Sequence, residues 1–278
     1  MSTNNQLKTK IKRNLKELFS KHKKLIILFI GLSGFLIFSF LQHTQVLPQK
    51  AISILSDIKV PMKNEKIIFI IPHADDEALA CSGLIQRSIK NNANVYIVLV
   101  TDNNNKNIKN KRYLEFFNSI NLHKIDTKNV FMLNRPDKKI SQIDQTILIN
   151  DLSSILFSIN PDFVIYPSVF DTHTDHRAIG QTTLELLKHY PKIRSYSYLI
   201  HYKYFPRPMK YLKNQFITPP LSLLSFNWEW QKFMLTSKER DLKCEAIFSY
   251  KSQLSYSILK KLLPSFCRLN ELYINYDF

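Results

Sequence analysis

The sequence predicts an α/β fold, a mostly parallel sheet with helices on both faces, preceded by one N-terminal transmembrane helix. Three observations support this. Apolar runs of strand length alternate with helical patterns from residue 66 onward, as is typical of parallel sheets with crossover helices. A charge-free apolar stretch occupies residues 25–41. The 278 residues, 45% of them hydrophobic, can form a substantial core, which excludes a mostly disordered chain.

The N-terminal segment begins with a basic tail. Residues 1–24 carry eight Lys and Arg against Glu17 alone, and so contribute +7 of the net charge of +17. As a helix, residues 25–41 (LIILFIGLSGFLIFSFL) would cover about 26 Å, close to the ~30 Å hydrocarbon core of a bilayer. In the twenty residues after residue 41, Lys50 and Lys59 are the only Lys or Arg residues. This asymmetry predicts a cytoplasmic N-terminus and an extracytoplasmic domain.

Two other interpretations of the apolar stretch stay open. A cleaved signal peptide also has a basic start, but its apolar region is typically shorter, and residues 47–51 (LPQKA) make a poor cleavage site. A buried core helix is the other alternative, although Gly31 and Gly34 among bulky residues on every face fit lipid better. We expect a single-pass protein of the cell (inner) membrane with four parts: a tail at 1–24, a transmembrane anchor at 25–43, a connector at 44–65 and a folded domain at 66–278.

Strands and helices are expected to alternate through the domain. The strands are near-continuous apolar runs such as KIIFIIP and VYIVLV, as expected for strands buried on both faces. In order we expect a strand at 66–72, a helix at 77–91, a strand at 95–100, a helix at 109–122, a strand at 130–133, a helix at 142–159, a strand at 163–166, a helix at 178–190 and a strand at 194–201. Beyond residue 201, prolines interrupt an aromatic stretch, and a last helix is expected at roughly 236–249.

Composition excludes several kinds of site. With 4 glycines, the chain has no glycine-rich phosphate loop. Cys81, Cys244 and Cys267 are too few and too scattered for a disulfide framework or a four-thiolate zinc site, and we expect Cys81 to be a buried packing residue. The charge of +17 suggests nucleic acid, but the one basic stretch with interleaved aromatics is 203–213 (KYFPRPMKYLK), which could equally contact an anionic lipid or polysaccharide. We expect no nucleic-acid partner.

Two clusters of acids and histidines lie just past expected strands. The first is PHADDE at 72–77, and the second is DTHTDH at 171–176. In open α/β sheets, ligands bind at the edge formed by the carboxyl ends of the strands. Three adjacent carboxylates repel one another unless a cation or a helix N-terminus compensates. Helix capping explains one or two of the acids, but it does not explain the histidine before them.

The residue types in these clusters indicate metal chemistry. Two histidines with one carboxylate are a common ligand set of open zinc sites, which keep one position for water. The clusters hold more ionisable groups than a metal needs. A zinc hydrolase requires that surplus, as a base beside the water and as a proton donor or oxyanion stabiliser opposite it. We therefore expect a catalytic site for Zn²⁺, with another divalent transition metal as the alternative.

The motifs HADDE at 73–77 and HTDH at 173–176 resemble those of the PIG-L/LmbE-like family of metal-dependent N-acetylglucosaminyl deacetylases. The resemblance covers roughly residues 66–255 and implies a Rossmann-like sheet. Three residues would then hold zinc: His73, Asp76 and His176. Asp75 would be the general base. His173 would stabilise the oxyanion or protonate the leaving amine, oriented by Asp175.

Weaker matches concern the substrate site. Arg112 and Glu115 stand where the family has an arginine–glutamate pair, and Asp137 matches an acid after the third strand. By resemblance, Arg112 and Asp137 would bind substrate. Without the resemblance, Arg112 would be interpreted as an exposed cation on a helix and Asp137 as a turn residue. Four later residues echo the family's K…Y-x-S-Q pattern: Lys243, Tyr250, Ser252 and Gln253.

These observations lead to one hypothesis and one alternative. The hypothesis is a membrane-anchored zinc hydrolase that removes the N-acetyl group from an N-acetylglucosamine-type sugar in a glycolipid, polysaccharide or glycoside. The alternative is a basic, membrane-tethered glycan- or lipid-binding protein with a non-catalytic metal site. The sequence leaves the sugar carrier and the oligomeric state open.

Overall fold

The computed structural model describes residues 20–43, 46–102, 109–203 and 205–276. The chain divides into two compact units, Met1–Gln45 and Val46–Phe278. In the first unit, helix α2 (Lys23–His43) contains an 18-residue window of mean hydropathy 1.9 with none of it buried. Among the described helices, α2 alone is long and apolar enough to cross a membrane. Most of the expected basic tail lies outside the described residues.

The second unit is built on one eight-stranded sheet of order β1-β7-β8-β6-β5-β2-β3-β4. Its strands are β1 (Ser56–Asp57), β2 (Lys66–Ile71), β3 (Asn94–Thr101), β4 (Val130–Arg135), β5 (Phe163–Pro167), β6 (Arg194–Tyr198), β7 (Trp228–Met234) and β8 (Asn270–Tyr276). Strand β8 runs antiparallel to β6 and β7, and every other neighbouring pair is parallel. The expected mostly parallel sheet is confirmed.

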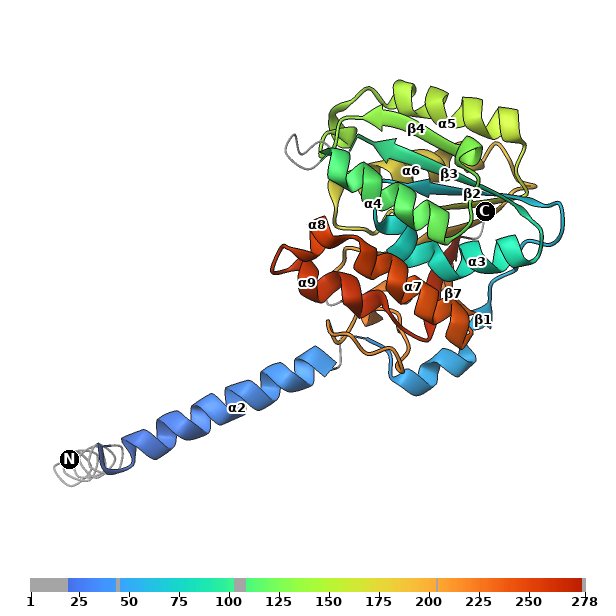
Figure 1. Cartoon of the computed structure of the whole chain (residues 1–278). Helices are drawn as coiled ribbons and strands as arrows, with labels where there is room; N and C mark the ends of the chain where they lie inside the picture. The colour runs from blue at the N-terminus through green and yellow to red at the C-terminus, as the bar shows by residue number, and fades with distance from the viewer. Residues whose placement is uncertain (1–19, 44–45, 103–108, 204, 277–278) are drawn as a thin grey trace, which may run out of the picture. The chain divides into compact units, whose positions relative to one another are not determined.

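Helices cover both faces of the sheet (Figure 1). They are α3 (Ser82–Lys90), α4 (Lys109–Leu122), α5 (Gln145–Ile159), α6 (Thr174–Leu187), α7 (Ser237–Ser249), α8 (Lys251–Leu254) and α9 (Leu259–Leu262), with short turns η1 (Gln49–Ile54), η2 (Glu77–Cys81), η3 (Thr127–Asn129), η4 (Ile140–Gln142), η5 (Leu221–Leu223) and η6 (Leu263–Phe266). Strand β2 shows why its sequence is continuously apolar. Phe69 belongs to the core under α3, α4 and α7, and Ile70 belongs to the core under α5 and α6.

The sheet extends beyond the strands that the sequence predicts. Strands β7 and β8 follow the proline-interrupted stretch and pair along their whole length. Strand β1 and turn η1 fall within the expected connector 44–65, so that segment packs on the domain from Val46 onward. Helix α6 begins at Thr174 rather than at 178, because the ring of His173 caps its first turn by accepting a hydrogen bond from the Asp175 backbone N–H.

A disulfide joins the end of the chain to α7. Cys244 in α7 and Cys267, just after η6, are bonded, and their Cα atoms lie 5.3 Å apart, an ordinary span for a disulfide. The sequence analysis did not anticipate this pairing, because the return of the chain over α7 brings together residues 23 positions apart. Cys81 is free and buried, as expected.

The strand order places the two acid and histidine clusters side by side. Strand β2 is flanked by β3 on one side and β5 on the other, both parallel to it. The order of the strands reverses between β2 and β5, so the loops after these strands diverge to opposite faces and leave a crevice between them. The motifs at 73–77 and 173–176 follow β2 and β5 respectively.

Candidate active site

A constrained turn links β2 to the helix that follows it. The Pro72 carbonyl accepts hydrogen bonds from the Thr101 backbone N–H (3.1 Å) and Oγ1 (2.8 Å), which ties the turn to β3. Asp75 has φ 128°, a region that side-chain-bearing residues rarely occupy and that costs backbone strain. The next turn, η2, is π-helical, a feature frequent at functional sites.

Three side-chain atoms from the two motifs meet at one point. His73 Nδ1 lies 3.1 Å from His176 Nε2, His176 Nε2 lies 3.2 Å from Asp76 Oδ2, and that oxygen lies 3.6 Å from His73 Nδ1. A tetrahedral ion with bonds of roughly 2.0–2.1 Å to nitrogen and oxygen separates its ligand atoms by roughly 3.3 Å. The triangle therefore fits one zinc-sized ion, and a shared cation satisfies two imidazole nitrogens that face each other.

Carboxylates face the far nitrogen of each ligand histidine. His73 Nε2 lies 3.1 Å from Asp137 Oδ1 and 3.2 Å from Asp175 Oδ2. His176 Nδ1 lies 3.2 Å from Asp171 Oδ2, an ion-pair distance at an angle outside hydrogen-bond geometry. Such partners fix the tautomer and ring orientation of metal-binding histidines. They leave His73 Nδ1 and His176 Nε2 to face the metal position.

Asp175 does not orient His173 through its carboxylate, as the resemblance implied. The carboxylate accepts hydrogen bonds from the backbone N–H groups of Lys138 (2.7 Å) and Ile140 (3.2 Å) and reaches His73. Only the backbone N–H of Asp175 contacts His173, donating to Nδ1 at 3.3 Å. The physical reason is that Asp175 stands in the first turn of α6 and faces the loop after β4. Its carboxylate therefore positions His73.

His173 lies beside the triangle of ligand atoms. Its ring centroid is 4.7 Å from that of His73, and one of its ring nitrogens lies within 4.8 Å of ligand atoms of His73 and His176. Because Nδ1 accepts the Asp175 N–H, Nε2 carries the proton of the neutral ring. Burial and the neighbouring histidines lower the pKa of His173, which favours that neutral form.

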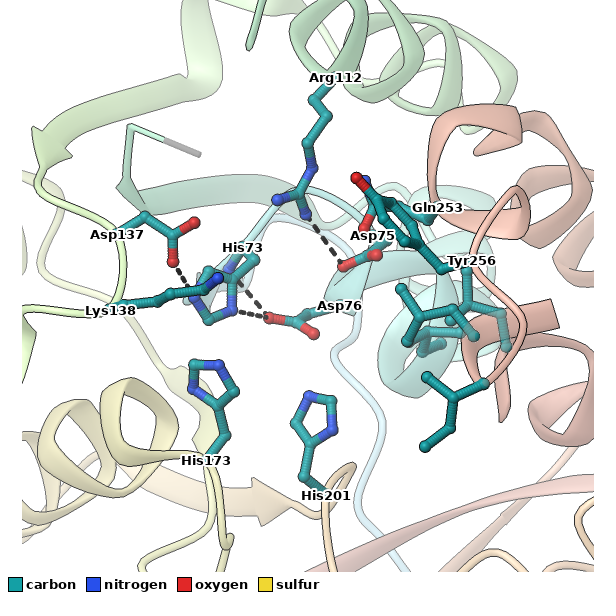
Figure 2. A pocket seen from close by; sticks show the side chains of 14 residues that line it. His73, Asp75, Asp76, Arg112, Asp137, Lys138, His173, His201, Gln253 and Tyr256 are labelled. Atoms are coloured by element: carbon teal, nitrogen blue, oxygen red, sulfur yellow. Dashed lines mark hydrogen bonds and ion pairs between the residues drawn. The ribbon is translucent and has the colours of Figure 1, made fainter. Parts of the chain in front are cut away.

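Asp75 and Arg112 face each other above the metal position (Figure 2). Burial raises the pKa of Asp75 to about 7, with Arg112 opposing the rise and Asp76 adding to it. Arg112 Nη2 lies 3.8 Å from Asp75 Oδ1 and donates to the Ala74 carbonyl at 2.9 Å. A carboxyl group that titrates near neutral pH suits a general base.

The third acid of the first motif, Glu77, supports the turn. It is fully buried, which raises its pKa. Its carboxylate accepts hydrogen bonds from Ser119 Oγ (2.7 Å), Tyr250 Oη (2.5 Å) and the Asp75 backbone N–H (3.2 Å). Glu77 thus connects the strained turn to α4 and to the end of α7.

Two residues of the later K…Y-x-S-Q pattern bond α7 and α8 to α4 and β8. Ser252 donates to Glu115 from its backbone N–H (2.9 Å) and its Oγ (2.5 Å). Lys243 pairs with Glu271 at 2.7 Å, and both side chains are fully buried. Glu115 is therefore bonded to Ser252 rather than to its helix neighbour Arg112.

A pocket of about 550 Å³ opens onto the metal position (Figure 2). Its polar side is lined by His73, Asp75, Asp76, Arg112, Asp137, Lys138, His173, His201 and Gln253. Its other wall, partly aromatic and otherwise apolar, is lined by Leu79, Tyr256, Ile258, Leu259 and Leu263. Size and lining are those of a small-molecule site, and both residues expected to bind substrate lie in it.

Sequence reasoning missed His201 and gave Asp171 no role. A ring nitrogen of His201 lies within 4.8 Å of ligand atoms of Asp76 and His176, and burial lowers its pKa to about 4. The His201 backbone N–H donates to Asp171 Oδ2 at 3.0 Å. The available signal for His201 was its position at the end of the strand expected at 194–201, because that strand ends at the same sheet edge as the strands that the two motifs follow.

Fold and site together define a class, the metal-dependent α/β hydrolases. Residues 68–187 match the PIG-L family, described as GlcNAc-PI de-N-acetylase. This segment runs from β2 through α6 and includes both histidine motifs. The resemblance that the motifs carry is therefore confirmed over this segment of the chain. The protein is a metal-dependent deacetylase.

Solved structures share the fold. The N,N'-diacetylchitobiose deacetylase from Pyrococcus horikoshii has a TM-score of 0.53 and 20% identity, covering 73% of this chain and 75% of its own. The A40926 pseudoaglycone deacetylase Dbv21 has a TM-score of 0.59 and 15% identity, covering 78% and 100%. The 4-carboxy-2-hydroxymuconate hydratase GalB from Pseudomonas putida has a TM-score of 0.52 and 12% identity, covering 77% and 96%. No curated protein matches the chain. Because a hydratase shares the fold, the reaction has to be argued from the site.

Proposed function

We propose that this protein removes the N-acetyl group from an N-acetylglucosamine-type amino sugar. The observation that carries the proposal is the meeting of His73 Nδ1, Asp76 Oδ2 and His176 Nε2 beside the carboxyl group of Asp75. The triangle supplies a metal position that leaves room for water, and Asp75 supplies a base. The family match supports an N-acetyl group as the target.

Zinc is the ion that we propose for the site. Two imidazoles and one carboxylate at tetrahedral separations suit it. Five carboxylates surround the two ligand histidines and favour a cation: Asp75, Asp76, Asp137, Asp171 and Asp175. A bound zinc ion supplies Lewis-acid chemistry, since it activates water and polarises an amide carbonyl.

The chain's own residues move the protons. Asp75 accepts the proton that water loses as it attacks the amide carbonyl carbon. His173 donates a hydrogen bond from Nε2–H to the carbonyl oxygen as negative charge develops there, and keeps its proton. The amide C–N bond then breaks, and the proton held by Asp75 passes to the departing nitrogen. The products are the free amine of the sugar and acetic acid, which ionises to acetate at neutral pH.

Arg112 and Asp137 are the residues that we propose as sugar contacts. Both line the pocket. Each also contacts the catalytic group next to it, because Arg112 faces Asp75 and Asp137 faces His73. Loss of either is therefore expected to affect turnover as well as substrate binding.

The same proposal includes anchoring by α2 in the cell (inner) membrane, with the domain outside the cytoplasm. The excess of Lys and Arg before α2 supports this orientation. The Cys244–Cys267 disulfide supports it independently, because disulfides persist in oxidising compartments. Cells would be trapped with acid and alkylated before any reduction. Both cysteines should then be found unalkylated, because the disulfide protects them. Finding both thiols free would contradict an extracytoplasmic domain.

The activity is tested with the zinc-loaded full chain in detergent. Acetate release would be measured over a panel of N-acetylhexosamine conjugates, including glycolipids, polysaccharide fragments and small glycosides. Release from at least one conjugate, with one free amine formed per acetate, is expected. Zinc binding and conjugate binding without release from any member would favour the alternative of a non-catalytic glycan- or lipid-binding protein.

A further inference from the structure

The chain enters the catalytic domain beside the start of an exposed loop. The Leu47 backbone N–H donates to the Pro219 carbonyl at 3.1 Å, and Val46 forms an antiparallel bridge with Pro220. Because this pairing is antiparallel, the residues after Pro220 leave it at the same end as the residues before Val46. The loop that follows Pro220 therefore starts where the chain arrives from α2.

That loop, residues 221–226 (LSLLSF), presents apolar side chains to its surroundings. Leu221 and Leu224 are exposed, and Phe226 is 105% exposed, so no part of its ring is covered by the domain. Leu223 alone of the four large apolar residues is buried. Exposure of a whole phenylalanine ring next to two partly exposed leucines is unfavourable in water, which points to a surface covered by something outside the domain.

The loop is held firmly rather than left to collapse onto the core. Trp228 Nε1 and Trp230 Nε1 both donate hydrogen bonds to the Leu223 carbonyl, at 2.9 and 2.8 Å. These two residues are all the tryptophans of the chain. With Leu223 fixed from behind, the neighbouring apolar side chains are kept pointing outward.

Chain length limits what can cover the loop. Only residues 44 and 45 separate His43, the last residue of α2, from Val46. Three peptide units span at most about 11 Å. If α2 crosses the membrane, as the proposed function states and as this inference requires, Val46 begins within that distance of the end of the spanning helix. We propose that residues 221–226 insert Leu221, Leu224 and Phe226 into the surface of the lipid bilayer, as a second membrane contact of the catalytic domain.

The test places an environment-sensitive fluorophore on the loop of the full chain. Phe226→Cys is labelled with a nitrobenzoxadiazole, because Cys81 is buried and the other two cysteines are bonded to each other. Phe157→Cys is the matched control, since Phe157 is 83% exposed but lies on α5. Both proteins are reconstituted in phosphatidylcholine vesicles with or without a phosphatidylcholine that carries a doxyl quencher on its acyl chain.

The doxyl lipid should quench the fluorescence of the label at position 226 severalfold and leave the label at 157 unquenched. Iodide dissolved in the water should instead quench the label at 157 more strongly than the label at 226. Leu224→Cys serves as a second labelling position and should behave like 226. A label at 226 that iodide quenches and the lipid does not would overturn the proposal. A label shielded from both quenchers would also overturn it, because another protein chain would then cover the loop. Alkaline carbonate extraction separates the two failures: release of the protein contradicts anchoring by α2, whereas retention with an unquenched 226 label contradicts the loop contact alone.

Discussion

At the residue scale, the chemistry depends on which atom of each side chain faces the metal position. His73 presents Nδ1 and His176 presents Nε2, and in both rings carboxylates face the other nitrogen. Asp75 stands outside the triangle of ligand atoms, next to Asp76, which stands in it. The strained backbone of Asp75 lets two adjacent carboxylates face different partners, Arg112 and His176.

Asp75→Asn should abolish most turnover without loss of metal. The amide cannot accept the proton from water, so kcat should fall by about 10²–10⁴-fold. Metal content, measured by mass spectrometry of the purified protein, should stay at the wild-type level, because Asp75 is not one of the three ligands. His176→Ala is the control that should lose both. Near-wild-type turnover by Asp75→Asn would remove Asp75 from its assigned role.

Asp171→Asn should weaken metal binding indirectly, through His176. Asp171 Oδ2 faces His176 Nδ1 and also accepts backbone N–H groups from residues 200 and 201. Loss of such a partner typically lowers metal affinity about 10–100-fold. Competition with a chelating dye measures the affinity. Asp151→Asn is the control, because Asp151 lies on α5 in a partly exposed pair with Arg135, and it should leave the metal affinity unchanged. Equal metal affinities in the two variants would contradict the role of Asp171.

The meeting of the two motifs at one site could be predicted at this scale, because each motif follows an apolar strand and parallel strands end at one sheet edge. The partners of these residues could not. Asp175 was expected to orient His173, and its carboxylate instead contacts His73 because of the direction in which the first turn of α6 faces. That direction depends on tertiary packing, which motif spacing does not contain.

At the element scale, the catalytic turn after β2 is held by parts of the chain far from it in sequence. Glu77 bonds to α4 and to Tyr250 at the end of α7, and the Cys244–Cys267 disulfide ties α7 to the segment after η6. The central strands and helices were predictable from alternation. Strands β7 and β8 were not, because prolines and mixed polarity hide their pattern, and their pairing with each other is what makes them strands.

Breaking the disulfide should destabilise the domain. For a loop of this size, the Cys244→Ala/Cys267→Ala variant should lose about 2–4 kcal/mol of unfolding free energy. Urea denaturation with and without reductant measures it. Reductant should bring the wild type to the stability of the variant and leave the variant unchanged. A wild type insensitive to reductant, and equal to the variant, would contradict the prediction.

His123 should make stability depend on pH. Its ring Nε2 lies 2.7 Å from Ser82 Oγ, its Nδ1 lies 2.7 Å from the Ser119 carbonyl, and burial lowers its pKa from 6.5 to about 4. The folded state thus keeps it neutral where the unfolded chain binds a proton. Stability should fall as the pH drops from 6.5 toward 4, by at most about 1.4 kcal/mol per pH unit from this group. His123→Gln should show a shallower dependence of melting temperature on pH over that window, and equal slopes would exclude this role.

At the scale of the whole molecule, the chain combines an apolar N-terminal helix with a domain whose residues 68–187 match the PIG-L family. The charge of +17 has its most concentrated part before α2. The basic stretch at 203–213 is packed on the domain in part, since Arg268 donates to the carbonyls of Pro208 and Lys210. Residues 1–24 therefore carry +7 of the net charge, which is its most concentrated part.

We propose that a metal held by His73, Asp76 and His176 acts with Asp75 to release acetate. The most direct measurement follows acetate release by the full chain from a conjugate that it deacetylates, first after chelation to remove metal and then after addition of one equivalent of zinc. Chelation should abolish release, zinc should restore it, and zinc should restore nothing in Asp75→Asn although the ion binds. Acetate release that persists in the metal-free protein, or that zinc restores equally in Asp75→Asn, would contradict it.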